Sequence, residues 1–238
     1  MKAVVIIPVK TFSNSKTRLH LSEKKTNELC KLLLEEVIMT ISKSKLINKI
    51  IVSSDSKKIL SIAKKYGAEV PFVRPKNLSK DSSIDYGVFL HCLNWLKKNE
   101  NYIPDLIVHL RPTYPIRSVK IVDKAIKFAL KNRNFDCIRS VCEPNQNPYK
   151  MWNIDRKNYL TPLLGNLKKE LYNYPRQKLQ KAYWQNAYID IIKYKTIKNK
   201  KSMTGKKILP FVLPQNNIFD IDDKFSFNII KKIYKNYK

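Results

Sequence analysis

The stretch Ala3-Val4-Val5-Ile6-Ile7-Pro8-Val9 is a continuous apolar run near the start of the chain. Because polar and apolar residues do not alternate in it, both of its faces should be buried, which is typical of a central strand in a parallel sheet. A polar segment, residues 10–18, follows directly. The sequence therefore predicts a buried strand that leads into a loop at its carboxyl end.

The chain then alternates between helix-like and strand-like patterns. Apolar spacing predicts helices at 22–42, 55–66, 84–98 and 118–131, and strands at 50–52, 70–73, 106–110 and 137–141. Later segments predict strands at 151–154, 188–192 and 208–212, a turn at 155–158 and a closing helix at 225–234. Ser22 is a candidate cap for the first helix, and Gly67 should end the second. This alternation predicts an α/β fold, a Rossmann-like, mostly parallel sheet with helices on both faces.

Composition excludes several classes of protein. No run of about 18 apolar residues is present, as a membrane-spanning helix would require, and the first residues lack the pattern of a secretory signal. We therefore expect a cytoplasmic protein with no membrane partner. The four cysteines lack metal-binding spacing and should be reduced core residues.

The charge balance first suggests a nucleic-acid partner. The formal charge is +28, from 47 basic and 19 acidic residues. Most of the basic residues are lysines, so we expect much of this charge to be solvated surface. We accordingly expect no specific nucleic-acid partner.

Polar segments follow three of the predicted strands, at residues 10–18, 53–55 and 111–117. The carboxyl ends of parallel strands are where such sheets bind ligands. In the first segment, Lys10, Lys16 and Arg18 could hold a triphosphate and neutralise charge on a pyrophosphate leaving group. The segment is not a Walker loop, because it lacks the glycines and the Gly-Lys-Ser/Thr ending. A solvated basic loop is the alternative interpretation.

Acidic residues are scarce, yet three of them fall within residues 220–223. In an extended segment Asp220 and Asp222 would share one face, where two carboxylates can hold Mg²⁺. The alternative is an acidic cluster at the start of the closing helix.

Four basic residues lie in segments marked by proline: Arg74, Arg111, Lys150 and Arg176. Arginine is the bidentate partner for carboxylate and phosphate, although any one of these residues could be ordinary surface. Residues 143–185 are rich in Tyr, Pro, Asn and Lys and show weak periodicity. Their aromatic side chains fit a core or subunit contact better than a platform for nucleic-acid bases.

Several segments together resemble the acylneuraminate (CMP-sialic acid) cytidylyltransferase family of nucleotidyltransferases. Arg111-Pro112-Thr113-Tyr114-Pro115-Ile116-Arg117 is similar to the family's RPTSPLR loop. The other matching segments follow in the family's order: 72–75 with 81–85, 147–152, 174–177, 183–187, 202–205 and 220–222. Each motif is weak alone, but together they cover nearly the whole chain. The resemblance implies a single nucleotidyltransferase domain, residues 1–238, in which residues 143–185 form an arm for dimerisation.

The resemblance also implies an activity and assigns roles to residues. It implies transfer of CMP from CTP to an acidic sugar, an acylneuraminate or other ulosonic acid, with release of pyrophosphate, in a homodimeric enzyme of surface glycan biosynthesis. The implied nucleotide-binding residues are Pro8, Lys10, Lys16, Arg18, Arg74, Ser82 and Ser83. The implied sugar-binding residues are Arg111, Thr113, Lys150, Arg176, Gln185 and Asn186. Lys16, Arg18 and Asp222 would be catalytic, and Asp220 and Asp222 would bind Mg²⁺.

The chain departs from the family pattern at specific positions. The family's glycine-rich phosphate loop is replaced by Thr11-Phe12-Ser13-Asn14-Ser15-Lys16, and residues 8–10 with 16–19 look more like the loop of 2-phospholactate guanylyltransferases. Ala187 stands where a glycine is more usual. The resemblance as a whole favours CTP, but these departures leave GTP open. The alternatives are guanylyl or other nucleotidyl transfer to a sugar 1-phosphate or small phosphorylated acid, and a non-catalytic nucleic-acid-binding protein.

Overall fold

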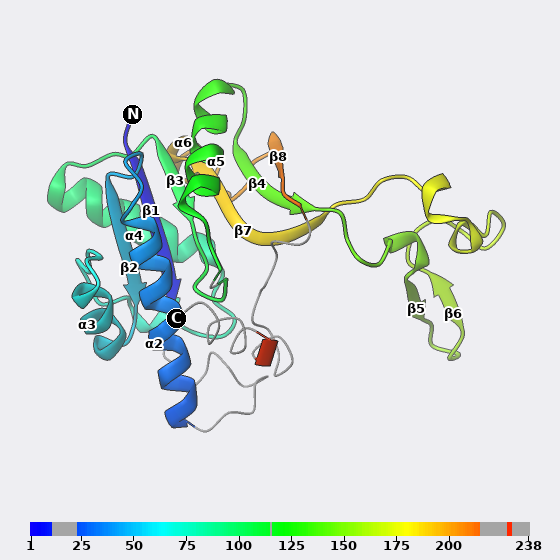
Figure 1. Cartoon of the computed structure of the whole chain (residues 1–238), viewed down its shortest axis with the longest axis horizontal. Helices are drawn as coiled ribbons and strands as arrows, with labels where there is room; N and C mark the ends of the chain where they lie inside the picture. The colour runs from blue at the N-terminus through cyan, green and yellow to red at the C-terminus, as the bar shows by residue number, and fades with distance from the viewer. Residues whose placement is uncertain (11–22, 115, 215–227, 230–238) are drawn as a thin grey trace.

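The structure is a computed structural model that describes residues 1–10, 23–114, 116–214 and 228–229. In the described residues a six-stranded sheet has the strand order β2-β1-β3-β7-β4-β8. Figure 1 shows a body in which helices pack around this sheet, and an arm that extends away from the body. The α/β class predicted from the sequence is confirmed, and the arm contains residues 152–162.

Strand β1 (Ala3–Val9) lies inside the sheet, as its apolar run predicts. It pairs in parallel with β2 (Lys49–Ser54) on one side and with β3 (Leu106–His109) on the other. Residues 3–7 have no exposed surface, and alternate side chains enter two separate core clusters. Burying such side chains on both faces contributes about 1.5–3 kcal/mol for each large residue, which makes β1 the centre of the core.

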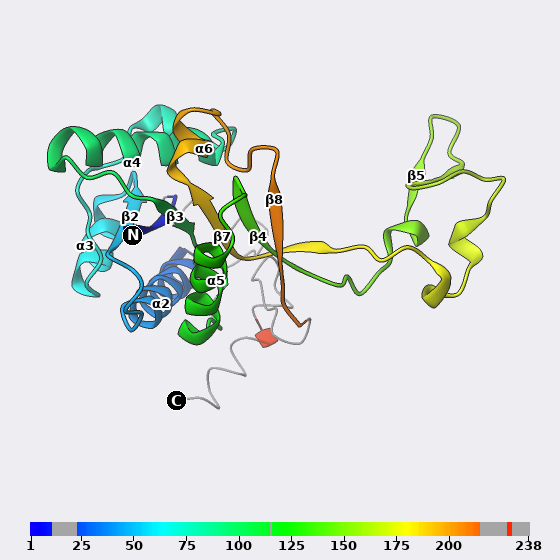
Figure 2. The same ribbon diagram turned by 90° about the horizontal axis from the view of Figure 1, so that it is seen from above.

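Helices cover both faces of the sheet (Figure 2). Helices α2 (Glu23–Ile41), α3 (Lys57–Lys65) and α5 (Val119–Lys131) pack on one face, and α4 (Asp85–Glu100) and α6 (Tyr194–Lys198) pack on the other. In α3 the buried residues Ile59, Leu60 and Ala63 follow helical spacing, and the Ser56 side chain caps the helix at the Ile59 amide. The layered arrangement expected from the alternating pattern is confirmed.

In the described part of the sheet, one strand runs antiparallel to its neighbours. Strand β7 (Trp184–Lys193) runs antiparallel between β3 and β4 (Cys137–Cys142), and β8 (Ile208–Val212) pairs in parallel with β4. The sheet is therefore mostly parallel, as predicted. Strand β7 is longer than the predicted 188–192, and helix α6 directly after it was not predicted.

One predicted strand is wrong. Residues 70–73 form no strand, and only Glu69 makes an isolated bridge, to Ile51. Pro71 lacks an amide hydrogen, so the ladder cannot continue past this point. The chain instead passes into a loop and a short 3₁₀ helix, η2 (Lys76–Leu78).

The arm is built from residues between β4 and β7. It contains the hairpin of β5 (Trp152–Ile154) and β6 (Leu160–Pro162) and three 3₁₀ turns, η3 (Pro148–Lys150), η4 (Leu171–Asn173) and η5 (Arg176–Lys178). The predicted turn at 155–158 joins the hairpin, where the Asp155 carboxylate accepts hydrogen bonds from the amides of Lys157 (2.8 Å) and Tyr159 (2.9 Å).

Two expectations from composition can be compared with the structure. All four cysteines are buried, and none forms a disulfide within the described residues, as predicted. None of the helices that the structure describes is long and apolar enough to cross a membrane. The predicted cap Ser22 lies outside the described residues, and of the closing helix 225–234 only Asn228 and Ile229 are described, in helical conformation.

Candidate active site

Strands β1, β2 and β3 run in parallel side by side, so their carboxyl ends lie at one edge of the sheet. The described parts of the predicted polar segments, Lys10, residues 53–55 and residues 111–114 with 116–117, lie at this edge. Lys10, just past β1, donates a hydrogen bond from Nζ to the Lys80 carbonyl (2.8 Å), and Nζ lies 3.6 Å from the Asp81 carboxylate. Pro8 is half-buried within β1. Lys10 thus joins the end of β1 to the loop that carries Ser82 and Ser83.

Arg74 lies beneath this edge and holds it together. Its side chain is 1% exposed, and its guanidinium donates to the Val9 carbonyl (3.0 Å) and to Ser79 Oγ (3.0 Å), and lies 3.5 Å from the Asp55 carboxylate. Its backbone amide also donates to the Ser54 carbonyl (2.8 Å). Burial lowers the pKa of Arg74, against the opposing effect of Asp55. Arg74 therefore ties the ends of β1 and β2 together.

Other residues proposed for the nucleotide are more exposed or lie outside the described residues. Ser82 is exposed, and Ser83 Oγ donates a hydrogen bond to the Asn77 carbonyl (3.2 Å). The remaining members of the predicted set lie outside the described residues: Lys16, Arg18, Asp220 and Asp222.

The loop after β3 is held by a second buried arginine. Arg117 donates hydrogen bonds to the carbonyls of Tyr188 and Arg111, and its guanidinium lies over the rings of Tyr114 (5.3 Å) and Tyr188 (4.8 Å). The Tyr188 hydroxyl in turn accepts from the Ser118 amide (2.7 Å). This packing fixes the loop that carries Arg111 and Thr113, both of which are partly exposed.

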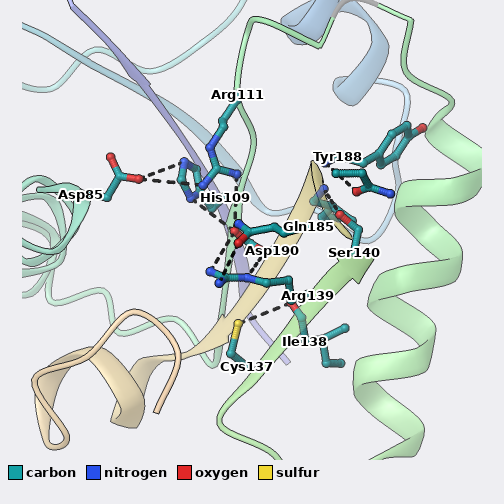
Figure 3. Close-up of polar contacts among 12 residues, drawn as sticks. Asp85, His109, Arg111, Cys137, Ile138, Arg139, Ser140, Gln185, Tyr188 and Asp190 are labelled. Atoms are coloured by element: carbon teal, nitrogen blue, oxygen red, sulfur yellow. Dashed lines mark hydrogen bonds and ion pairs between the residues drawn. The ribbon is translucent and has the colours of Figure 1, made fainter. Parts of the chain in front are cut away.

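A charged cluster surrounds Asp190 at the same edge (Figure 3). Asp190 on β7 lies opposite His109 on β3 and Arg139 on β4, and its side chain is 1% exposed. Arg139 Nε lies 3.0 Å from Asp190 Oδ1, and Arg111 NH1 lies 3.4 Å from Oδ2. Arg111 NH2 also lies 3.9 Å from the Asp85 carboxylate, at the start of α4. Three sheet strands and one helix thus contribute charged or polar groups to one place.

His109 is the neutral member of this cluster. Burial lowers its pKa well below the ordinary value, and the nearby charges of Arg111 and Arg139 lower it further. Its ring packs edge-on against Phe89. Because the imidazole stays neutral, the Asp190 carboxylate is balanced by arginines and not by a histidine cation.

Strand β7 is kinked where two further predicted sugar-binding residues lie. Asn186 is buried and its Oδ1 accepts from the Tyr188 amide (3.2 Å), while Ala187 has a left-handed backbone (φ 57°). A side chain in this region costs about 1 kcal/mol, which explains why glycine suits the position. Beyond the kink, Gln185 Oε1 accepts from Arg139 NH1 (3.1 Å). The kink brings Gln185 to the rim of the charged cluster.

The arm carries the other two predicted sugar-binding residues. Lys150 and Arg176 are exposed, and Arg176 NH2 donates to the Pro144 carbonyl (2.9 Å). Arg176 lines a cavity of about 250 Å³ at the base of the arm, together with Asn147 and Gln180. The structure therefore does not bring these two residues into the cluster around Asp190.

The sequence interpretation missed three members of the site: His109, Arg139 and Asp190. Each is a polar residue within or at the end of an otherwise apolar predicted strand. Polar residues at buried strand positions need partners, so their coincidence in three strands was an available signal. In the described residues, no group of three or more His, Cys, Asp or Glu side chains is placed to hold a metal ion.

Comparison with known proteins finds a matching family model, similar proteins and similar solved structures. A family model described as cytidylyltransferase matches residues 22–206. Post-translational flagellin modification protein B of Campylobacter coli is 29% identical over 202 residues, 83% of this chain and 82% of that protein. CMP-N,N'-diacetyllegionaminic acid synthase of Campylobacter jejuni is 30% identical over 197 residues, 82% of this chain and 80% of that protein. The solved structure of CMP:2-keto-3-deoxy-manno-octonic acid synthetase complexed with CTP has a TM-score of 0.66 at 12% identity over all of both chains, which is a likeness of fold.

Replacing Arg74 with lysine should destabilise the protein. Arg74 reaches Ser79 and Val9 with two different nitrogens, Nε and NH2, whereas lysine has only one. The buried charge would therefore lose hydrogen bonding worth about 3 kcal/mol in total. Urea denaturation should show this loss in the free energy of unfolding. Arg133→Lys, at an exposed arginine after α5, is the control and should change it by less than about 0.5 kcal/mol. Equal stability of the two variants would contradict the structural role of Arg74.

Proposed function

The chain belongs to the cytidylyltransferase family, and we propose that it transfers CMP from CTP to the anomeric hydroxyl of an acidic sugar of the ulosonic acid class, with release of pyrophosphate. The observation that carries this proposal is the cluster of guanidinium groups at the carboxyl ends of the parallel strands, a setting suited to an anionic ligand. A relative named CMP-N,N'-diacetyllegionaminic acid synthase supports transfer of CMP to a carboxylate-bearing sugar. The fold is also that of a synthetase solved in complex with CTP.

The chemistry requires in-line displacement at phosphorus. The anomeric oxygen forms a bond to the α-phosphorus of CTP, the bond from that phosphorus to the bridging oxygen breaks, and the hydroxyl proton is released. Such transfer depends on positioning and charge neutralisation. In this proposal Lys10, Lys16 and Arg18 neutralise the phosphates, and the residues around Arg111 bind the sugar. Pro8, Arg74, Ser82 and Ser83 shape the nucleotide side, while Thr113, Gln185 and Asn186 complete the sugar side. Lys150 and Arg176 lie on the arm, so in this proposal they reach the sugar from the arm and not from the cluster around Asp190.

We further propose Mg²⁺ as the cofactor, with Asp220 and Asp222 as its ligands. The oxygen donors of two carboxylates suit this hard cation. When bound, Mg²⁺ would neutralise phosphate charge and make pyrophosphate a better leaving group.

The arm supports a homodimer. It exposes many large apolar side chains, including Ile154 (69% exposed), Leu160 (56%) and Leu167 (55%). An apolar surface of this kind usually marks an interaction site, and Figures 1 and 2 show that the arm projects away from the body. We propose that residues 143–185 pack against a second copy of the chain.

The proposed reaction also fits a cytoplasmic enzyme. CTP is a cytoplasmic metabolite, and the four buried thiols suit a reducing compartment. CMP-activated acidic sugars are building blocks for surface glycans, the biosynthetic role we propose. The charge of +28 then requires no nucleic-acid partner.

The activity is tested by a pyrophosphate-release screen. The purified protein with Mg²⁺ should release pyrophosphate from CTP in the presence of at least one acid among N-acetylneuraminate, 3-deoxy-manno-octulosonate, legionaminic acid and pseudaminic acid derivatives. With the same acid, GTP, UTP and ATP should release pyrophosphate at least about tenfold more slowly than CTP. With CTP and a sugar 1-phosphate, pyrophosphate release should stay at background. Turnover of GTP with a sugar 1-phosphate, and none with CTP, would contradict this proposal and favour guanylyl transfer to a sugar phosphate.

The metal assignment is tested by substituting two neighbouring aspartates, one at a time. Asp222→Asn should lower kcat/KM by about a hundredfold or more, because a ligand of the charge-neutralising ion is lost. Asp223→Asn is the matched control, because in an extended segment Asp223 would lie on the other face, and it should change kcat/KM by less than about threefold. Equal effects of the two substitutions would remove Asp222 from the site.

The arm interface is tested by adding charge to its apolar surface. The double variant Ile154→Asp, Leu160→Asp should convert a dimer into a monomer in light scattering after gel filtration, because two buried unpaired charges are too costly for the interface. Leu130→Asp, at a 44% exposed leucine on α5, is the control and should stay dimeric. A monomeric wild type, or a variant that stays dimeric, would contradict the proposed interface.

A further inference from the structure

Two arginines share one buried carboxylate in the cluster around Asp190. Arg139 approaches it with two nitrogens, Nε at 3.0 Å from Oδ1 and NH2 at 3.5 Å from Oδ2, while Arg111 adds NH1 at 3.4 Å from Oδ2. A single bidentate arginine is enough to balance a buried carboxylate. The second guanidinium therefore brings a positive charge that Asp190 does not need.

The surroundings leave this additional charge available to a ligand. His109 is neutral, and Asp85 is about half exposed and reaches Arg111 only at 3.9 Å, beyond hydrogen-bond distance. Both arginines are about one-quarter exposed, 26% for Arg111 and 24% for Arg139, whereas Asp190 below them is buried. The guanidinium groups can thus face a ligand while the carboxylate that orients them stays out of reach.

Two guanidinium groups on one carboxylate repel one another, and a second anion between them relieves that repulsion. Each arginine also keeps donors beyond those used on Asp190, since a guanidinium has five N–H groups. The Gln185 side chain, which Arg139 NH1 contacts at 3.1 Å, lies beside Arg139 at the rim. A ligand carboxylate has a negative charge and two oxygens, so it can accept hydrogen bonds from both guanidinium groups.

We propose that Arg111 and Arg139 together bind the carboxylate of the acidic sugar, and that Asp190 is a positioning residue that holds both arginines. This inference rests on the proposed function, which it deepens by assigning Arg139 and Asp190. In a 2-ulosonic acid the carboxylate and the anomeric hydroxyl are on the same carbon atom. Binding the carboxylate therefore also places the attacking oxygen, so these arginines select the acid and orient it.

The test compares an acid with its uncharged ester. For the acid that the wild type uses best, Arg139→Gln should raise KM about tenfold to a hundredfold, the loss of a charged hydrogen-bonded contact, and leave KM for CTP within about twofold. The wild type should prefer the free acid to its methyl ester, and Arg139→Gln should lose most of this preference. Arg133→Gln, at an exposed arginine, is the matched control and should behave as wild type.

The Asp190→Asn variant distinguishes a positioning role of Asp190 from an effect of its negative charge alone. If only net charge mattered, removal of the Asp190 charge would strengthen binding of the acid and lower its KM. If Asp190 holds the arginines, KM for the acid rises in this variant, while Arg139→Lys, which keeps charge but loses the two-point contact, gives an intermediate increase. A lower KM for the acid in Asp190→Asn would overturn the positioning role. Unfolding midpoints of the variants confirm that a folded protein is compared.

Failure of the proposed function can be distinguished from failure of this inference. If no acid and no nucleotide gives pyrophosphate, the proposed function fails, and binding of N-acetylneuraminate and its methyl ester is then followed by ligand-observed NMR. Stronger binding of the acid, lost in Arg139→Gln, would still support the carboxylate site. Equal binding of acid and ester by the wild type, or an unchanged preference in Arg139→Gln, would overturn it.

Discussion

The Asp190 carboxylate lies in a row across three strands, with His109 on one side and Arg139 on the other. A buried charge of this kind is stable only where partners surround it, because removal from water costs several kcal/mol. Arg139 and Arg111 supply that compensation from β4 and from the loop after β3. The interaction therefore links the antiparallel strand β7 to both of its neighbours at the edge where ligands of such sheets bind.

Around this link the edge contains four arginines with different roles. Arg74 and Arg117 direct their guanidinium groups to backbone carbonyls, so they fix the ends of strands and the loop after β3. Arg111 and Arg139 are partly exposed and turn toward a carboxylate. The protein has a formal charge of +28, and burial and hydrogen bonding distinguish these four arginines from the many lysines in the sequence. The number of positive charges alone is a poor guide to function.

The elements that could be predicted from the sequence are those with a strong local pattern. The run at residues 3–9 and the helices α2 to α5 follow from apolar spacing, because each buries one face or both faces against a core. The strand predicted at 70–73 failed because Pro71 interrupts the ladder, a backbone property that hydrophobicity does not report. Of the candidate site, the strand-end loops and Arg111 were predicted, while Arg139 and Asp190 were overlooked inside apolar strands.

The sequence by itself determined the α/β class, the central position of β1 and the motifs that point to a cytidylyltransferase, because these depend on local spacing and on the order of segments. Only the tertiary structure decided which polar residues meet. Asp190 reaches Arg139 across 51 positions of sequence and Arg111 across 79, and the insertion of β7 between β3 and β4 brings them together. The physical reason is that a buried carboxylate takes its partners from whichever strands the sheet places beside it, and strand order is a property of the whole fold.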